Sequence, residues 1–270
     1  MAWPRECFPR NNSIPMAPAL QIGVRSERDP TNPYQTPNLH MKKTALILAA
    51  LLTGASLSAD ESAPASSYNV TADFSYATKY VFRGIEYAEG AFQPSIKLTT
   101  GDFYIGVWSS LPADRGYEAE VDYYAGYGLK LSDSVSLDVG ATVYHYPGLD
   151  VPGADEATFE GYAGITGSVE GVNLGLYLYN DFTLDVVTVQ GNLGYSIPVN
   201  DTVSLSFTAS LGHAKPDGGD GYTYYSAGLA LPYKLSDAAS LTLGVNWASH
   251  DLDGVEDNHA WANVGFSYTF

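Results

Sequence analysis

The sequence predicts an all-β protein, a single antiparallel up-and-down transmembrane β-barrel of about twelve strands. Three observations predict this fold. Apolar and polar residues alternate at period two through most of residues 68–270, short and long connections alternate along the chain, and aromatic residues gather at both ends of the apolar faces. Such a pattern describes strands that separate an apolar medium from a polar one.

A helical membrane protein is excluded, because the longest apolar segment, residues 44–55, is too short to cross a bilayer. That segment follows Met41-Lys42-Lys43 and precedes small residues that end at Ala59. A charged start, an apolar middle and a small-residue end are typical of a secretory signal. We therefore expect residues 41–59 to be a signal peptide.

The segment before the signal needs its own explanation. Residues 1–40 are rich in Pro, Asn and Arg and have no apolar period, so we expect them to be disordered. The simplest account is a start codon assigned too early, with Met41 as the true start; the alternative is a genuine cytoplasmic extension. Residues 60–67 are expected to be a linker, which leaves residues 68–270 for the barrel.

The expected mature chain is strongly acidic. From Asp60 onward it has 7 basic and 27 acidic side chains, a net charge of −20. This balance excludes nucleic-acid binding by phosphate neutralisation. The single cysteine, Cys7, precedes the signal, so a disulfide, a haem-attachment motif and a thiol nucleophile are excluded as well. No cofactor is expected, since nothing resembles a phosphate-binding glycine loop or a zinc site.

The elements follow from the alternation, in order along the chain. The expected strands are 68–80, 91–99, 103–111, 119–131, 135–146, 158–169, 172–180, 186–199, 203–214, 222–235, 240–250 and 260–270. Their lengths suit the roughly 9–11 residues that a tilted strand needs to cross a bilayer. A soluble sandwich could show the same alternation, so the pattern of the strands alone does not decide.

The connections favour the barrel. One set is tight: 99–102, 132–134, 170–171, 200–202 and 236–239. The other set is mostly longer: 81–90, 112–118, 147–157, 215–221 and 251–259, with 181–185 as the exception. Short turns at one rim and long loops at the other are typical of outer-membrane barrels, and they place both mature termini at the short-turn, periplasmic rim.

Aromatic residues on the apolar face form two bands. Near the short-turn rim lie Tyr68, Phe103, Tyr195, Tyr233, Tyr268 and Phe270. Near the long-loop rim lie Tyr80, Phe92, Phe159 and Trp247, and aliphatic residues fill the space between. Bilayer interfaces select this arrangement.

Two resemblances add to these patterns. The ending, with Phe266, Tyr268 and a terminal Phe270 at period two, resembles the last strand of bacterial outer-membrane barrels, which implies recognition by the barrel-insertion machinery. The stretches 78–84 (TKYVFRG), 103–108 (FYIGVW) and 120–127 (EVDYYAGY) resemble the TorF-type porin family, also called Gcw_chp. That resemblance covers roughly the first third of the mature chain; it implies an outer-membrane location and a porin, and it supplies no substrate.

Arg83 is the clearest single candidate for a specific role, because it is a lone arginine in the first expected long loop of a very acidic protein. A guanidinium can hold a carboxylate with two hydrogen bonds. It could therefore anchor the loop inward over acidic wall residues, which we favour, or bind an anionic solute.

Charged residues on the polar face are distributed unevenly along the barrel axis. Glu120, Asp122 and Glu160 lie toward the long-loop rim, and Lys97, Lys130 and Lys234 toward the short-turn rim, with Lys79 breaking the pattern. A cation would then meet an acidic outer mouth before a basic inner constriction. The alternative is that charges pair across strands and plug the barrel, Lys130 with Asp138 and Lys97 with Asp73.

Aromatic residues are also numerous on the polar face, and they include Tyr104, Trp108, Tyr124, Tyr162 and Tyr177. They could stack on sugars or nucleosides, or simply fill space. A barrel of twelve strands falls between filled eight-stranded barrels and water-filled sixteen-stranded porins, so we expect a narrow, partly filled pore.

Three acidic loops, 150–156, 217–220 and 251–257, suit loose cation bridging to lipopolysaccharide rather than a specific metal site. Catalysis is not expected, because His145 has no adjacent nucleophile and Ser249 and His250 alternate to opposite faces. The sequence therefore favours an outer-membrane, porin-like channel for passive diffusion of small hydrophilic solutes. The alternative is a closed structural or surface-interaction barrel that conducts nothing.

Overall fold

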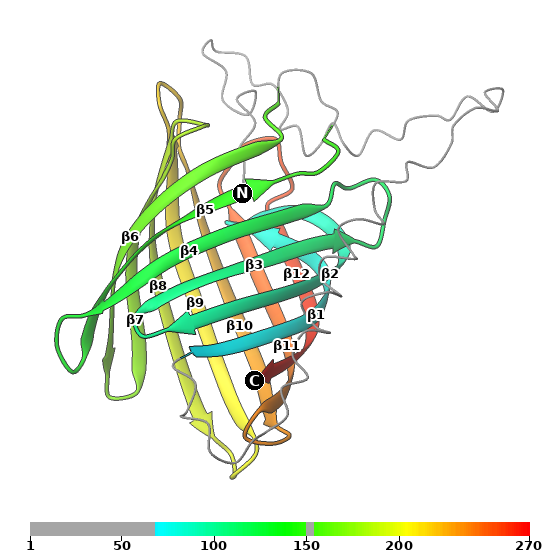
Figure 1. Ribbon diagram of the computed structural model, residues 1–270. Helices are drawn as coiled ribbons and strands as arrows, with labels where there is room; N and C mark the ends of the chain where they lie inside the picture. The colour runs from blue at the N-terminus through cyan, green and yellow to red at the C-terminus, as the bar shows by residue number, and fades with distance from the viewer. Residues whose placement is uncertain (1–67, 150–153) are drawn as a thin grey trace. The chain divides into compact units, whose positions relative to one another are not determined.

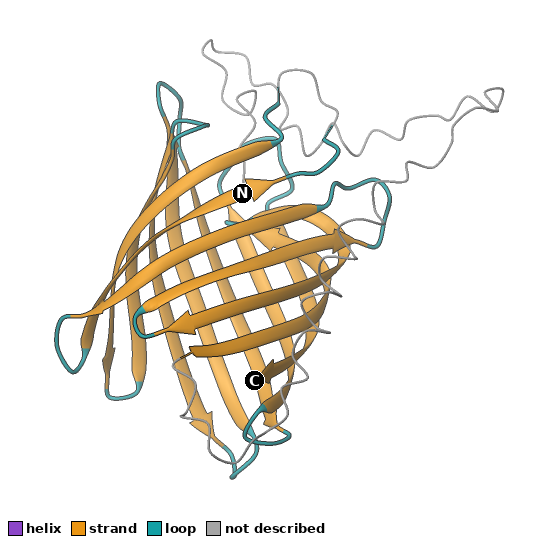
Figure 2. Ribbon diagram, in the orientation of Figure 1, coloured by secondary structure: helices purple, strands orange, loops and turns teal. Residues whose placement is uncertain are grey.

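The computed structural model describes residues 68–149 and 154–270, and the expected extension, signal peptide and linker lie outside them. The described chain folds into strands joined by turns and loops (Figure 1, Figure 2). The strands are β1 (Tyr68–Phe82), β2 (Ile85–Thr100), β3 (Phe103–Pro112), β4 (Glu120–Lys130), β5 (Val135–His145), β6 (Ala157–Val169), β7 (Val172–Asp181), β8 (Val186–Pro198), β9 (Ser204–Pro216), β10 (Tyr222–Lys234), β11 (Ala239–His250) and β12 (Asn258–Thr269).

The strands form one closed barrel. Each strand pairs antiparallel with the next, and β12 returns to pair with β1 from Thr71↔Thr269 to Ala77↔Asn263. The expected fold class is therefore confirmed, as a twelve-stranded antiparallel barrel with up-and-down order. Among the described residues, no helix meets the length and apolarity needed to span a membrane.

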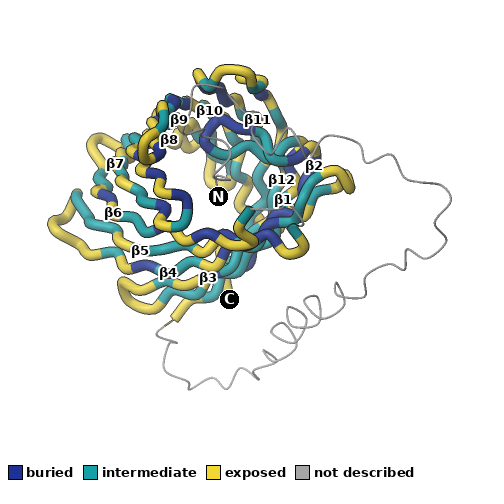
Figure 3. Tube along the Cα trace, turned by 90° about the horizontal axis from the view of Figure 1, so that it is seen from above, coloured by how far each residue is buried: buried dark blue, intermediate teal, exposed yellow. Residues whose placement is uncertain are grey.

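The alternation in the sequence becomes the two faces of the barrel wall. On β7, Leu174, Leu176 and Leu178 are 47%, 60% and 52% exposed on the outside, whereas Tyr177 and Tyr179, which alternate with them, point inward. Viewed along the barrel, the wall is a closed ring on which exposed and less exposed positions alternate (Figure 3). A band of large apolar side chains thus faces outward without protein cover, as a lipid-facing surface requires.

The outward position of these apolar side chains leads to a testable prediction. Leu176→Arg at the middle of β7 is expected to lower the free energy of unfolding in lipid by about 2–4 kcal/mol, because a charge near the bilayer midplane loses its hydration. Chemical denaturation followed by tryptophan fluorescence measures the loss. Thr208→Arg, on the inner face of β9, should change stability far less; equal losses for the two variants would contradict the assignment of the faces.

Two of the short turns share one sequence. Lys130-Leu131-Ser132-Asp133 and Lys234-Leu235-Ser236-Asp237 both close with a serine side chain that accepts a backbone N–H two residues on, at 3.3 Å in the first turn and 3.2 Å in the second. In each turn the lysine binds the aspartate three residues later. Local hydrogen bonds of this kind fix a tight turn without a contribution from distant residues.

One expected loop is wrong. Residues 81–90 continue β1 and β2 as a hairpin, and the turn is only Arg83-Gly84, with φ of 47° and 84°. Positive φ at both central residues is what a type I′ turn requires. The hairpin bends into the barrel, so both of its faces are covered; Tyr80, expected in the outer aromatic band, instead packs on Trp108 with ring centres 5.3 Å apart.

Candidate functional site

The tip of the first hairpin, residues Tyr80–Tyr87, lies inside the barrel, and we call it the inner hairpin. Arg83, Gly84 and Ile85 are all buried although they form the end of a hairpin. A free two-stranded ribbon is marginal in water, so the inner hairpin must draw its order from the wall that surrounds it. Three separate attachments to the wall do this.

The first attachment is an ion pair. The Arg83 guanidinium donates from Nη1 to Glu160 Oε2 at 2.8 Å and from Nη2 to Oε1 at 2.9 Å, with both side chains at most 3% exposed. The rings of Phe82 and Tyr179 lie 4.8 Å and 4.7 Å from the guanidinium carbon. Arg83 is therefore a charged clamp between β1 and β6.

The second attachment is apolar. Ile85 is 3% exposed and packs in a buried cluster with Leu184, Val186, Ala214, Tyr222 and Tyr224. Tyr222 also donates its hydroxyl to the backbone oxygen of Arg83 at 3.2 Å. Burying an isoleucine side chain stabilises a fold by roughly 1.5–3 kcal/mol, so Ile85 contributes substantially to the docking of the inner hairpin.

The approach of the turn to the wall is close. A Cβ atom on Gly84 would lie 2.9 Å from the backbone oxygen of Ser249 and 3.0 Å from the Cβ of Tyr224. Together with its positive φ, this explains why glycine follows Arg83.

The third attachment is polar and joins the inner hairpin to β12. Glu86 accepts from Lys79 Nζ at 2.6 Å, and His259 Nδ1 lies 3.0 Å from the same Glu86 oxygen. His259 Nε2 in turn lies 3.0 Å from the backbone oxygen of Glu256. The inner hairpin is thus tied to β6, to β8–β10 and to β12, which together surround the long-loop half of the lumen.

The acidic residues expected near the long-loop rim do line this half. Glu160 holds Arg83 and also accepts from the Tyr144 hydroxyl at 2.9 Å. Glu120 is 2% exposed and accepts from Tyr146 at 3.1 Å, while Asp122 is 9% exposed. Glu160 therefore serves the inner hairpin, and Glu120 and Asp122 line the wall beneath it.

The structure shows the surroundings of the three lysines that were expected to form a constriction. Lys130 and Lys234 lie at the short-turn rim, where their side chains are 66% and 54% exposed and pair with Asp133 and Asp237. The hydrogen bond and charge of Lys234 lower the pKa of the Asp237 carboxyl. Lys97 is exposed on β2 and has no ion pair with any described residue. A constriction at these three lysines therefore stays a prediction.

The alternative pairing of lysines with wall aspartates is not what the structure shows. Asp138 accepts from the hydroxyls of Tyr104 at 2.7 Å and Tyr177 at 3.1 Å. Asp73 accepts from Ser95 at 3.0 Å. Both aspartates thus organise neutral neighbours on the inner wall rather than a plug of ion pairs.

The inward tyrosines lie flat on the wall because glycines make room for them. A methyl group added to the glycine would overlap the tyrosine ring in each cross-strand pair, which are Gly126–Tyr104, Gly106–Tyr124, Gly140–Tyr162, Gly164–Tyr177 and Gly212–Tyr224. Tyrosine–glycine pairs of this kind stabilise a curved sheet and keep bulky rings out of the lumen. The expected aromatic lining is therefore present on the wall, with Trp108 packed against the inner hairpin.

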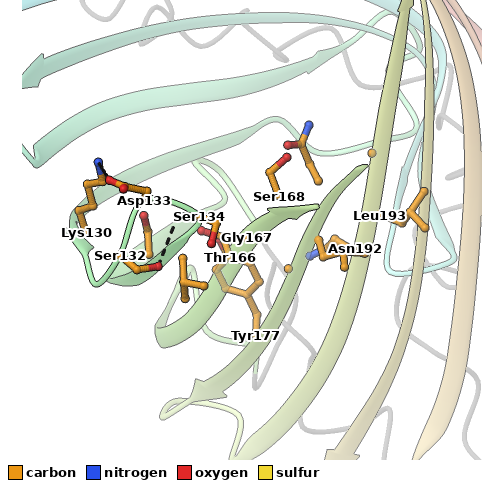
Figure 4. Close-up of a pocket in the computed structure, with 16 residues that line it drawn as sticks. Lys130, Ser132, Asp133, Ser134, Thr166, Gly167, Ser168, Tyr177, Asn192 and Leu193 are labelled. Carbon is orange, nitrogen blue, oxygen red and sulfur yellow. Dashed lines mark hydrogen bonds and ion pairs between the residues drawn. The ribbon is translucent and has the colours of Figure 1, made fainter. Parts of the chain in front are cut away.

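A hollow of about 500 Å³ lies at the short-turn end, lined by residues from the end of β4 to β8 (Figure 4). Its lining combines hydroxyl, amide and glycine positions with apolar side chains; the polar members include Ser136, Thr166, Ser168, Asn173 and Asn192, and the apolar ones Val135, Leu174 and Leu193. The inner hairpin thus occupies the long-loop half of the barrel, and this hollow lies in the short-turn half.

The long-loop rim is acidic. Its described loops carry the exposed carboxylates of Asp114, Asp155, Glu156, Asp185, Asp217, Asp220, Asp251, Asp253, Glu256 and Asp257. Among the described residues of these loops, Arg115 is the one basic side chain, with Lys215 close by at the end of β9. Residues 150–153 of one expected acidic loop fall outside the described part. This rim favours cations on electrostatic grounds.

Sequence reasoning missed the other attachments of the inner hairpin, namely the apolar cluster around Ile85 and the contacts of Arg83 with Tyr179 and Tyr222. One signal was available. Arg-Gly stands between Tyr80 and Phe82 on one side and Ile85 and Tyr87 on the other, which is the pattern of a two-residue turn between short apolar strands.

Comparison with known proteins agrees with the fold. The family model described as "Bacterial protein of unknown function (Gcw_chp)" matches residues 61–265. The solved KdgM porin is 12% identical with a TM-score of 0.52, over 75% of this chain and 99% of its own. The NanC porin is 12% identical with a TM-score of 0.50, over 74% and 98%. None of the curated proteins matches.

Proposed function

The chain belongs to the Gcw_chp family and has a porin-like fold, and from this premise we propose that it is an outer-membrane channel for passive diffusion of small hydrophilic solutes. The observation that carries the proposal is the contrast between the two faces of a closed wall. The outside is apolar, while the inside has, at the short-turn end, a hollow of about 500 Å³ lined in part by hydroxyl and amide side chains. A protein that served only as a structural barrel could fill such a space with side chains, as small barrels do.

In this proposal the short-turn rim and both barrel termini face the periplasm. The inner hairpin is the narrow part of the path, near the outer mouth, and Arg83 anchors it rather than binding a solute. The acidic loops meet lipopolysaccharide through bridging cations, and Phe270 is recognised by the insertion machinery.

A second candidate function has one specific observation in its favour. The inner hairpin is attached on three sides and buries Ile85 at 3% exposure, as a closed, non-conducting barrel would also require. Planar-bilayer recording separates the two. The channel proposal expects resolved single-channel steps from the purified native protein; a protein that inserts, shows heat-modifiable migration and stays silent would support the closed barrel.

The channel should prefer cations. With a tenfold KCl gradient, the reversal potential is expected to show a K⁺ over Cl⁻ preference of about threefold or more, because the carboxylates of the long-loop rim raise the local cation concentration. The preference should weaken when both solutions approach 1 M salt, where the Debye length falls to about 3 Å. Replacing Asp251, Asp253 and Asp257 by Asn should weaken it too. An anion preference at low salt would contradict the assignment.

A further inference from the structure

The hollow at the short-turn end carries hydrogen-bonding groups that the fold itself does not use. The hydroxyls of Ser136, Thr166 and Ser168 and the amide of Asn173 all line it. None of these four side chains has a hydrogen-bond partner among the described residues. They can therefore both donate to and accept from a molecule in the hollow.

One aromatic ring completes the lining, that of Tyr177. Figure 4 shows it beside Thr166 and Gly167 at the edge of the hollow. Its ring lies over Gly164 and is stacked on Tyr179 with an interplanar angle of 20°, while its hydroxyl donates to Asp138 at 3.1 Å. Gly164 on the wall and Asp138 at the hydroxyl thus fix the orientation of the ring. The ring therefore presents a fixed apolar surface next to free hydroxyl groups.

The two charged side chains in the lining are paired with each other, because Lys130 at the rim binds Asp133 at 3.1 Å. Asp138 is not part of the lining, and both of its oxygens already accept from tyrosine hydroxyls. An ionic solute would therefore gain no free opposite charge in the lining itself, yet would lose part of its hydration. The lining instead suits a neutral molecule that has many hydroxyl groups and a flat face of C–H bonds, because such a face packs on the negative face of an aromatic ring.

We propose that this hollow is a binding site for a neutral saccharide of one or two rings, with Tyr177 as the platform and Thr166 and Asn173 as hydrogen-bonding partners. The volume lies within the range of about 300–1,000 Å³ found for small-molecule sites. A planar nucleobase fits less well, because the lining holds one ring rather than two that could sandwich a base. The inference rests on the proposed function only in that the saccharide arrives as a permeating solute.

Isothermal titration of the folded full-length barrel in detergent, with maltose as the probe, tests this inference. The native protein should bind maltose with millimolar affinity. Tyr177→Leu should weaken binding at least tenfold, and Thr166→Ala with Asn173→Ala should weaken it as well. Tyr177→Phe keeps the platform and should keep most of the affinity. Tyr195→Leu, on the outer face of β8, is the matched control and should bind as the native protein does.

Several results would overturn the inference: no maltose binding by folded native protein, undiminished binding by Tyr177→Leu, or uridine binding as tightly as maltose. The titration needs no current through the barrel. Maltose binding by a protein that is silent in bilayers would thus overturn the channel proposal alone, and conductance without maltose binding would overturn the saccharide site alone.

Discussion

Removing the inner hairpin is expected to raise the single-channel conductance several-fold. The change replaces residues 80–88 by Asn-Gly, which joins Lys79 to Glu89, two residues that are already cross-strand partners. Asn-Gly is the preferred type I′ turn, so the shortened hairpin should close without strain. Conductance should rise because the side chains that fill the long-loop half of the lumen are gone. Planar-bilayer recording in symmetric KCl measures the change.

The control shortens a loop elsewhere in the same half of the barrel. Shortening the loop Asp217–Asp220, which lies outside the lumen, should leave the conductance near its native value. If the hairpin variant folds with heat-modifiable migration and conducts as the native protein does, the inner hairpin is not the narrow part of the path.

The second large effect is expected at the buried ion pair. Glu160→Gln leaves the Arg83 guanidinium buried without its counter-charge, and removal of one partner of such a pair costs about 3–5 kcal/mol. Because Arg83 is held in the lumen by this pair, the cost should appear as opening of the inner hairpin rather than as loss of the barrel. Hydrogen exchange at the amides of residues 82–87 measures it, and their protection should fall by about two to four orders of magnitude.

The double variant Arg83→Leu with Glu160→Leu is the control for this prediction. It removes both charges, so its hairpin should be better protected than in Glu160→Gln. Protection that stays at the native level in Glu160→Gln would show that the ion pair does not hold the hairpin.

Most of the fold could be predicted from the sequence because each strand separates two media. Lipid outside and polar lumen inside impose period-two alternation, and a strand such as β4 shows it without interruption from Glu120 to Lys130. Tight turns add local signals, such as the repeated Lys-Leu-Ser-Asp. These features depend on neighbours in sequence, and the strand boundaries from sequence lie close to those of the structure for β3–β12.

The inner hairpin was missed because its strands do not separate lipid from a polar lumen. Inside the lumen both faces of residues 80–87 meet protein, so apolar Phe82 and Ile85 and charged Arg83 and Glu86 follow one another without a period. Arg83 could be expected to anchor an inward loop over acidic wall residues. Its pairing with Glu160 depends on the closure of the barrel, which brings residues 77 positions apart together.

The local ion pairs of Lys130 and Lys234 were missed for a different reason. The alternation places Lys130 and Lys234 on the inner face, but each is the last inward residue before a turn, where a long side chain reaches the rim. The aspartate three residues later in Lys-Leu-Ser-Asp then competes as a local partner. The position of each lysine before a turn and the aspartate three residues later can both be read from the sequence. The local ion pair forms because it needs no contact with residues far away in the chain.

Disulfide cross-linking between the inner hairpin and the opposite wall tests most directly that the hairpin lies within the lumen. Ile85→Cys with Ala214→Cys joins two members of one buried cluster, in a chain whose native cysteine, Cys7, is replaced by serine. We predict efficient oxidation to a cross-linked form that migrates differently on non-reducing gels and reverts with dithiothreitol. Ala209→Cys, on the outer face of β9, is the control partner for Ile85→Cys and should not cross-link. No cross-link between positions 85 and 214, or equal cross-linking with position 209, would contradict the placement of the hairpin.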